Sequence, residues 1–70
     1  MNRQATFRIE CNAPMYGPLL PEAGRNQIDV NERSLAVVMA AKSVTIPVGC
    51  EIRVIHVPSG EVLFRKSAEL

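Results

Sequence analysis

The C-terminal part of this chain carries the pattern that most restricts its fold, two β-rich runs separated by a turn. Residues 51–57 and 61–66 are the two runs, and Pro58, Ser59 and Gly60 lie between them. Proline presets φ for the first turn position, and glycine accepts the left-handed conformation that a hairpin bulge requires. The sequence therefore predicts a C-terminal β-hairpin.

A three-residue turn of this kind determines which residues face each other. It pairs Val57 with Glu61 and places Arg53 opposite Arg65, a like-charge pair that is destabilising unless a carboxylate lies nearby. One face of the predicted hairpin carries Ile52, Val54, His56, Val62, Phe64 and Lys66. The other face carries Arg53, Ile55, Val57, Glu61, Leu63 and Arg65. We expect the first face to pack on a helix and the second to lie outside.

Two further segments precede the hairpin. Residues 5–11 alternate between apolar and polar side chains, which predicts a half-buried strand. Residues 12–26 contain three prolines and two glycines, which predicts a long loop. The apolar side chains in this loop favour an ordered excursion over a flexible linker.

The middle of the chain predicts a helix over residues 32–43. Asn31 is a favoured N-cap residue. Leu35, Val38 and Met39 share one helical stripe, so we expect them to face the core.

Short β-rich segments flank this helix. Residues 44–48 predict an edge strand because Pro47 cannot donate to a central ladder. Residues 27–30 are too few to decide between a short strand and a loop.

The predicted fold is a single small α+β domain over residues 1–70. It has a mainly antiparallel sheet of three to four strands with one helix packed on one face. We expect the helix to contact Phe7, Ile9, Ile52, Val54, Val62 and Phe64. Folding at this size buries only about 60% of the unfolded chain's surface, so a partner subunit would add stability.

Composition excludes several classes of function. The chain has eight Lys and Arg residues and seven Asp and Glu residues, for a net charge of +1. The strong positive field of a nucleic-acid binder is therefore absent. The longest apolar run, residues 35–41, is far shorter than the roughly 20 residues of a membrane-spanning helix. Because the first residues also lack the apolar core of a secretory signal, we expect a cytoplasmic protein with no membrane partner.

No set of residues has the spacing of a catalytic or metal site. Cys11 and Cys50 are the two cysteines, without a CxxC motif, and free thiols are favoured over a disulfide between them. His56 could join them as a third soft ligand, but an ordinary hydrogen-bonded histidine is favoured. Cys50 follows Gly49 and is expected to be the more accessible thiol, with its reactivity open. We expect no enzymatic activity, no cofactor and no metal.

Two groups of residues are candidates for interaction. The first lies in the predicted loop and consists of Met15, Tyr16, Leu19 and Leu20. It is either a recognition surface for a protein or peptide or a lid over a small core, and the lid is favoured. The second lies on the outer hairpin face and consists of Arg53, Ile55, Val57, Leu63 and Arg65. Either the arginine stems cover its apolar side chains, or a second copy of the chain buries this face or pairs with an exposed strand edge.

These observations favour a small non-catalytic binding or assembly module that forms a homo-oligomer, expected to be a dimer. The alternative is a nucleic-acid-associated accessory protein that uses Arg8, Arg53 and Arg65 on one sheet face. That alternative is weaker because the face lacks aromatic residues for base stacking and also carries Glu10 and Glu61.

Overall fold

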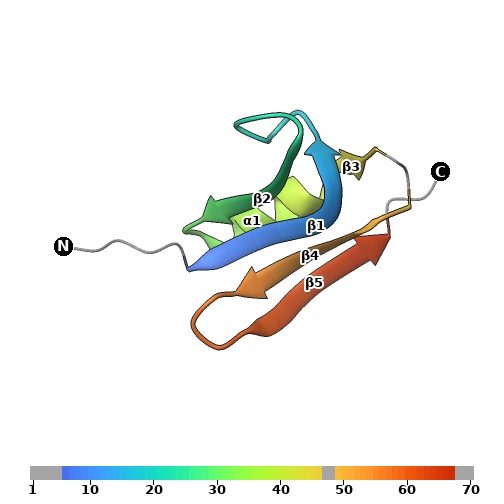
Figure 1. Ribbon diagram of the computed structural model, residues 1–70. Coiled ribbons are helices and arrows are strands. Elements are labelled where there is room, and N and C mark those ends of the chain that lie inside the picture. The colour runs from blue at the N-terminus through green and yellow to red at the C-terminus, as the bar shows by residue number, and fades with distance from the viewer. Residues whose placement is uncertain (1–5, 47–48, 68–70) are drawn as a thin grey trace.

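The computed structural model describes residues 6–46 and 49–67, which form a sheet with one helix on one face (Figure 1). Its elements are β1 (Phe7–Tyr16), β2 (Arg25–Val30), α1 (Arg33–Ala41), β3 (Val44–Thr45), β4 (Glu51–His56) and β5 (Glu61–Ser67). The long strands follow the order β2-β1-β4-β5, and β3 pairs with the end of β1. All pairings are antiparallel. The predicted α+β fold with a C-terminal hairpin is confirmed.

β1 is longer than expected and runs through the centre of the sheet. The predicted loop over residues 12–26 is wrong at both ends, because residues 12–16 belong to β1 and residues 25–26 belong to β2. Pro14 fits because it lies in an irregular stretch of β1, where the pairing with β2 shifts between Glu10 and Met15. Its carbonyl still accepts a hydrogen bond from the Ile46 N–H at 3.2 Å.

A short connection links β1 to β2 and passes close to the C-terminal end of α1. The N–H of Gly24 donates to the Met15 carbonyl at 2.8 Å. A Cβ at Gly17 would lie 3.0 Å from Ser43 Oγ, so this segment passes very close to the residue that follows α1.

β2 is a full edge strand that completes the core face of β1. Ile28 lies opposite Ile9, and Val30 lies opposite Phe7. Ile28 and Val30 are buried, whereas the other side chains of β2 are exposed.

The face of α1 that packs on the sheet differs from the face predicted from the apolar stripe in the sequence. Ala36, Met39 and Ala40 are buried, whereas Leu35 is 45% exposed and Val38 is 44% exposed. The expectation that Leu35 and Val38 face the core is therefore wrong. The two alanines let the helix backbone lie close to the sheet, and this packing decides the helical face in place of the larger side chains.

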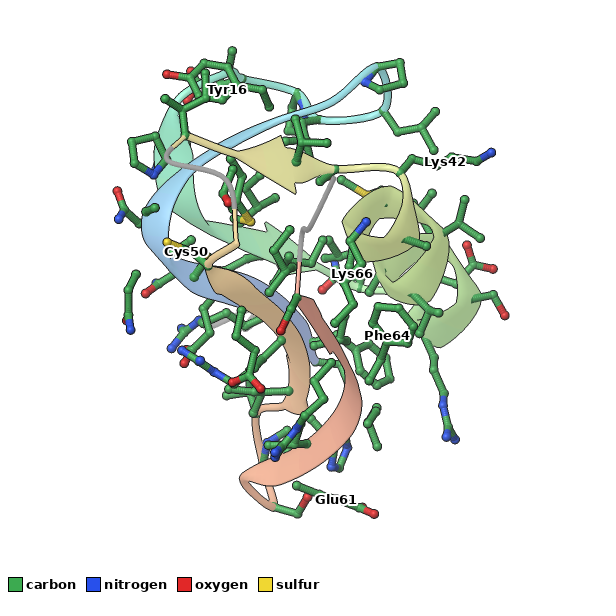
Figure 2. All side chains as sticks on the ribbon, turned by 90° about the vertical axis from the view of Figure 1, so that its right-hand side faces the viewer. Tyr16, Lys42, Cys50, Glu61, Phe64 and Lys66 are labelled. Carbon is green, nitrogen blue, oxygen red and sulfur yellow. The ribbon has the colours of Figure 1, made fainter. Side chains whose placement is uncertain are left out.

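Both ends of α1 differ from the predicted arrangement. The N-cap position is Glu32 in extended conformation, without a side-chain capping bond, so the prediction of an Asn31 cap is wrong. At the other end, the Ser43 hydroxyl donates to the Met39 carbonyl at 2.6 Å, and Lys66 Nζ on β5 donates to the Ala41 carbonyl at 2.7 Å. Figure 2 shows Lys66 reaching from β5 toward the end of the helix. These carbonyls need such partners because the last turn of a helix leaves them unbonded.

The strand predicted over residues 44–48 is shorter in the structure. β3 comprises Val44–Thr45, and residues 47–48 lie outside the described residues, as does residue 5 of the first predicted strand.

The hairpin closes through a four-residue turn over residues 57–60. His56 pairs with Glu61, so the predicted pairing of Val57 with Glu61 is wrong. The Gly60 N–H donates to the His56 carbonyl at 2.7 Å, and Ser59 Oγ accepts from the Glu61 N–H at 3.2 Å. These local bonds stabilise the longer turn.

A bulge in β5 restores the predicted register beyond the turn. Val54 pairs with Phe64 and Ile55 pairs with Val62, which leaves Leu63 as the extra residue. The predicted pair of Arg53 with Arg65 is therefore confirmed. The expectation that Val62 belongs to the core face is wrong, because its partner Ile55 lies on the opposite face from the buried Val54.

Candidate interaction surface

The sheet face opposite α1 carries ion pairs between side chains of neighbouring strands. Arg8 on β1 donates from Nε to Asp29 of β2 at 3.0 Å. Arg53 on β4 reaches Glu10 of β1 at 3.2 Å. These contacts follow from the register, because Arg8 lies opposite Asp29 and Glu10 lies opposite Arg53.

Glu51 resolves the like-charge pair that the hairpin register creates. Its carboxylate lies 3.0 Å from Arg53 and 3.9 Å from Arg65. The hydrogen bond to Glu51 raises the pKa of Arg53 above its ordinary value, against the lowering effect of burial, and Glu10 adds to the rise. The arginines of this face thus form ion pairs with carboxylates of the same chain.

Three apolar side chains lie beside these ion pairs and form what we call the hairpin patch, consisting of Ile55, Val62 and Leu63. The bulge puts Val62 and Leu63 on the outer side together, opposite Ile55. Val62 is 36% exposed, and Ile55 and Leu63 are partly exposed. The patch therefore groups three partly exposed apolar side chains on the outer face next to the turn.

β5 next to the patch is the last strand of the sheet. No described strand pairs with its outer edge. It has seven residues and no proline, so a full row of backbone donors and acceptors lies along that edge. The hairpin patch and the open edge meet at Val62 and Leu63.

Val57, predicted as part of the outer strand surface, lies in the turn instead. Its N–H donates to the Thr6 carbonyl at 2.8 Å, which ties the turn to the segment before β1. His56 beside it forms a 2.7 Å hydrogen bond between Nδ1 and Ser59 Oγ, and its ring centroid lies 5.6 Å from that of Phe7. These contacts give His56 a local structural role in the turn.

The loop group separates in the structure. Met15 is fully buried in the core, and Leu20 packs against the core from its edge. Leu19 is 45% exposed, and Tyr16 is partly buried on the end of β1. Because only one large aliphatic side chain of this group is well exposed, the contacts favour the lid over a recognition surface.

A second exposed apolar region lies on β3 and just after it, where sequence reasoning placed no interaction. Val44 is 52% exposed and Ile46 is 60% exposed, and Val44 lies opposite Tyr16 of β1. The signal for this region was the run of β-branched residues at 44–46, which alternates around the buried Thr45.

One open hollow of about 450 Å³ lies at the start of β2, lined by Pro21, Glu22, Arg25, Ile28 and Asp29. Its charges are already paired, since Arg25 contacts Glu22 and Asp29 contacts Arg8. The hollow thus offers a ligand no unpaired charge.

Both cysteines are free thiols in the structure. Cys11 is buried in the core, and Cys50 packs partly buried against it. Within residues 6–46 and 49–67, no three His, Cys, Asp or Glu side chains are grouped so as to hold a metal ion.

Comparison of the chain with protein-family models, with curated proteins and with solved structures finds no match in any of the three. Among the described residues, no helix has the length and apolar character needed to cross a lipid bilayer.

Proposed function

We propose that this chain is a small non-catalytic assembly module that forms a homodimer through its hairpin. The observation that carries the proposal is the bulge at Leu63, which turns Val62 out of the core face and beside Ile55. A valine left 36% exposed forfeits part of its burial free energy, which is about 0.8 kcal/mol for each buried methylene. A second copy of the chain that covers the hairpin patch recovers that burial.

The charge distribution supports a second copy as the partner. The net charge of +1 creates little repulsion between two copies. On the outer face, Arg8 and Arg53 are held by Asp29 and Glu10, so their charged groups do not oppose an approaching chain of the same sign.

The same ion pairs argue against the alternative of a nucleic-acid partner. Arg8, Arg53 and Arg65 each lie within 4 Å of a carboxylate of this chain. Phosphates would have to displace these carboxylates before neutralising the arginines. Phe7 and Phe64 lie on the helix side of the sheet, so they offer no stacking platform on the arginine face.

We place the proposed dimer in the cytoplasm. The support is chemical, because Cys11 and Cys50 are both free thiols and such a pair suits a reducing compartment. Fractionation of the source cells tests this placement, and recovery of the chain from an oxidising compartment would contradict it.

The test of self-association compares two valines that have similar exposure on different surfaces. Val62 is 36% exposed on the hairpin patch, and Val38 is 44% exposed on α1. Sedimentation equilibrium would measure the mass of the wild type, Val62→Lys and Val38→Lys from 1 to 500 µM, on the order of typical weak-dimer affinities.

We expect the wild type to reach twice the mass of one 7.7 kDa chain. The Val62→Lys variant should raise the dimer dissociation constant at least about tenfold, because a charge enters the contact, whereas Val38→Lys leaves it unchanged. A wild type that stays at the mass of one chain contradicts the proposal, and so does equal weakening by both variants.

A further inference from the structure

We propose that the two copies join β5 to β5 in antiparallel register with Phe64 on the two-fold axis. This inference rests on the proposed function and specifies the contact that it requires. The result is a single sheet that continues from one copy into the other.

β5 is better suited than β2 to extend the sheet. β2 is the opposite edge of the sheet, but its exposed side chains are polar, and Arg25 and Asp29 are engaged in ion pairs within the chain. β5 has seven residues and carries the hairpin patch beside its open edge. Pairing at β5 thus buries apolar side chains together with backbone groups.

An axis through Phe64 places this residue opposite itself. Phe64 is only partly buried at the margin of the core, which leaves part of its ring for a contact with the second copy. Figure 2 shows Phe64 on β5 below the helix, on the side of the sheet that α1 covers. Aromatic residues paired across antiparallel strands stabilise the pairing by roughly 0.2–1 kcal/mol.

The bulge then determines which charged residues meet. In β4, Val54 lies opposite Phe64 and, two residues on, His56 lies opposite Glu61, so the bulge takes up one extra residue. A strand that pairs with the other edge of β5 meets the same extra residue. Counting two residues from Phe64 of the second copy brings its Lys66 opposite Glu61.

Glu61 and Lys66 therefore form two equivalent ion pairs, one on each side of the axis, when Lys66 turns from the Ala41 carbonyl toward the second copy. Within one chain the two residues are five positions apart on an extended strand, which separates them by roughly 16 Å. They cannot pair inside one copy. Among the described residues the Glu61 carboxylate makes no ion pair, so it is available to Lys66 of the second copy.

Arg65 completes the contact on the outer side. By the same count it lies opposite the bulged residues Val62 and Leu63 of the second copy. Its side chain is 61% exposed, and its ion pair with Glu51 is long at 3.9 Å. The aliphatic stem of Arg65 can lie over these two apolar side chains while its guanidinium stays in water.

A charge swap tests the register because rescue can come only from contacts between copies. Sedimentation equilibrium would measure the dimer dissociation constant of Glu61→Lys, of Lys66→Glu and of the double variant. Since Lys66 also bonds the Ala41 carbonyl, Lys66→Met serves as a control that removes this bond without reversing the charge. Circular dichroism confirms that each variant is folded.

We expect each single reversal to raise the dissociation constant about tenfold, because two like-charge contacts arise in each dimer. The double variant should return to within about threefold of Lys66→Met. If the double variant has a dissociation constant as high as the single variants, this register is overturned. If Val62→Lys still disrupts the dimer in that case, the proposed function stands. A wild type without any dimer overturns both.

Discussion

At the scale of single residues, small side chains set how closely the segments of this molecule approach each other. Gly17 faces Ser43 so closely that an added Cβ would lie 3.0 Å from Ser43 Oγ and 3.1 Å from the Lys42 carbonyl oxygen. Ala36 and Ala40 are fully buried between α1 and the sheet. Ser43 is also fully buried, and its hydroxyl satisfies the Met39 carbonyl. Crowding at these positions leaves little room for larger residues.

The Gly17→Ala variant tests this crowding. We expect it to lower the free energy of unfolding by about 1–3 kcal/mol, because the new methyl group forces backbone or Ser43 to shift. Urea denaturation followed by circular dichroism measures the change.

Gly60 supplies the matched control, since a Cβ there meets nothing within 4 Å but its φ is +77°. Asparagine tolerates this left-handed conformation, so Gly60→Asn should cost much less than Gly60→Ala. At Gly17, where space is limiting, asparagine should cost at least as much as alanine. If Gly17→Ala is as stable as the wild type, Gly17 and Ser43 are packed less closely than the structure shows.

At the scale of elements, the phase of α1 decides which helix residues hold the domain together. Met39 is buried at 5% exposure, whereas Val38 beside it is 44% exposed. The helix makes its packing contacts with β1, β4 and β2 and leaves β5 at the margin. Two adjacent apolar residues of one helix therefore differ sharply in their contribution to stability.

We expect Met39→Ala to lower the free energy of unfolding by about 2–5 kcal/mol, since it opens a cavity under the helix. Val38→Ala should change it by less than about 0.5 kcal/mol, because Val38 is 44% exposed and lies outside the buried core. Urea denaturation of both variants measures the difference. Equal costs would place Val38 in the core and contradict the observed helical phase.

The elements also show what the sequence could predict. The hairpin was predictable because proline, glycine and flanking β-branched residues act locally. The pairing of Arg53 with Arg65 followed from the same local rule. β1 beyond Cys11 was not predictable from such rules, because Pro14 is tolerated only where the pairing with β2 becomes irregular.

The helical face and the bulge depend on distant contacts. Leu35 and Val38 match a helical stripe better than Ala36 and Ala40 do, yet the close approach of helix and sheet selects the alanines. Likewise, the bulge that exposes Val62 follows from the four-residue turn, which depends on side-chain bonds of Ser59. The outer face was predicted as a candidate site, but the position of Val62 on it was not.

At the scale of the whole molecule, the helix covers the sheet unevenly. α1 packs on β2, β1 and β4 and leaves β5 at the margin, and no described strand pairs with the outer edge of β5 (Figure 1). The partly exposed hairpin patch lies on the sheet face opposite α1. The opposite sheet face is held by ion pairs between Arg8, Glu10, Asp29 and Arg53. A second copy joined at β5 would complete the sheet where a single chain leaves it unfinished.

Amide hydrogen exchange at two protein concentrations tests this account most directly. Above the dimer dissociation constant, the β5 amides that point away from β4 should exchange at least about tenfold more slowly than in dilute protein. The outer amides of β2, which face no partner in the proposed dimer, should exchange equally fast at both concentrations. If the outward amides of β5 exchange at the same rate from dilute to concentrated protein, the chain does not pair through this strand.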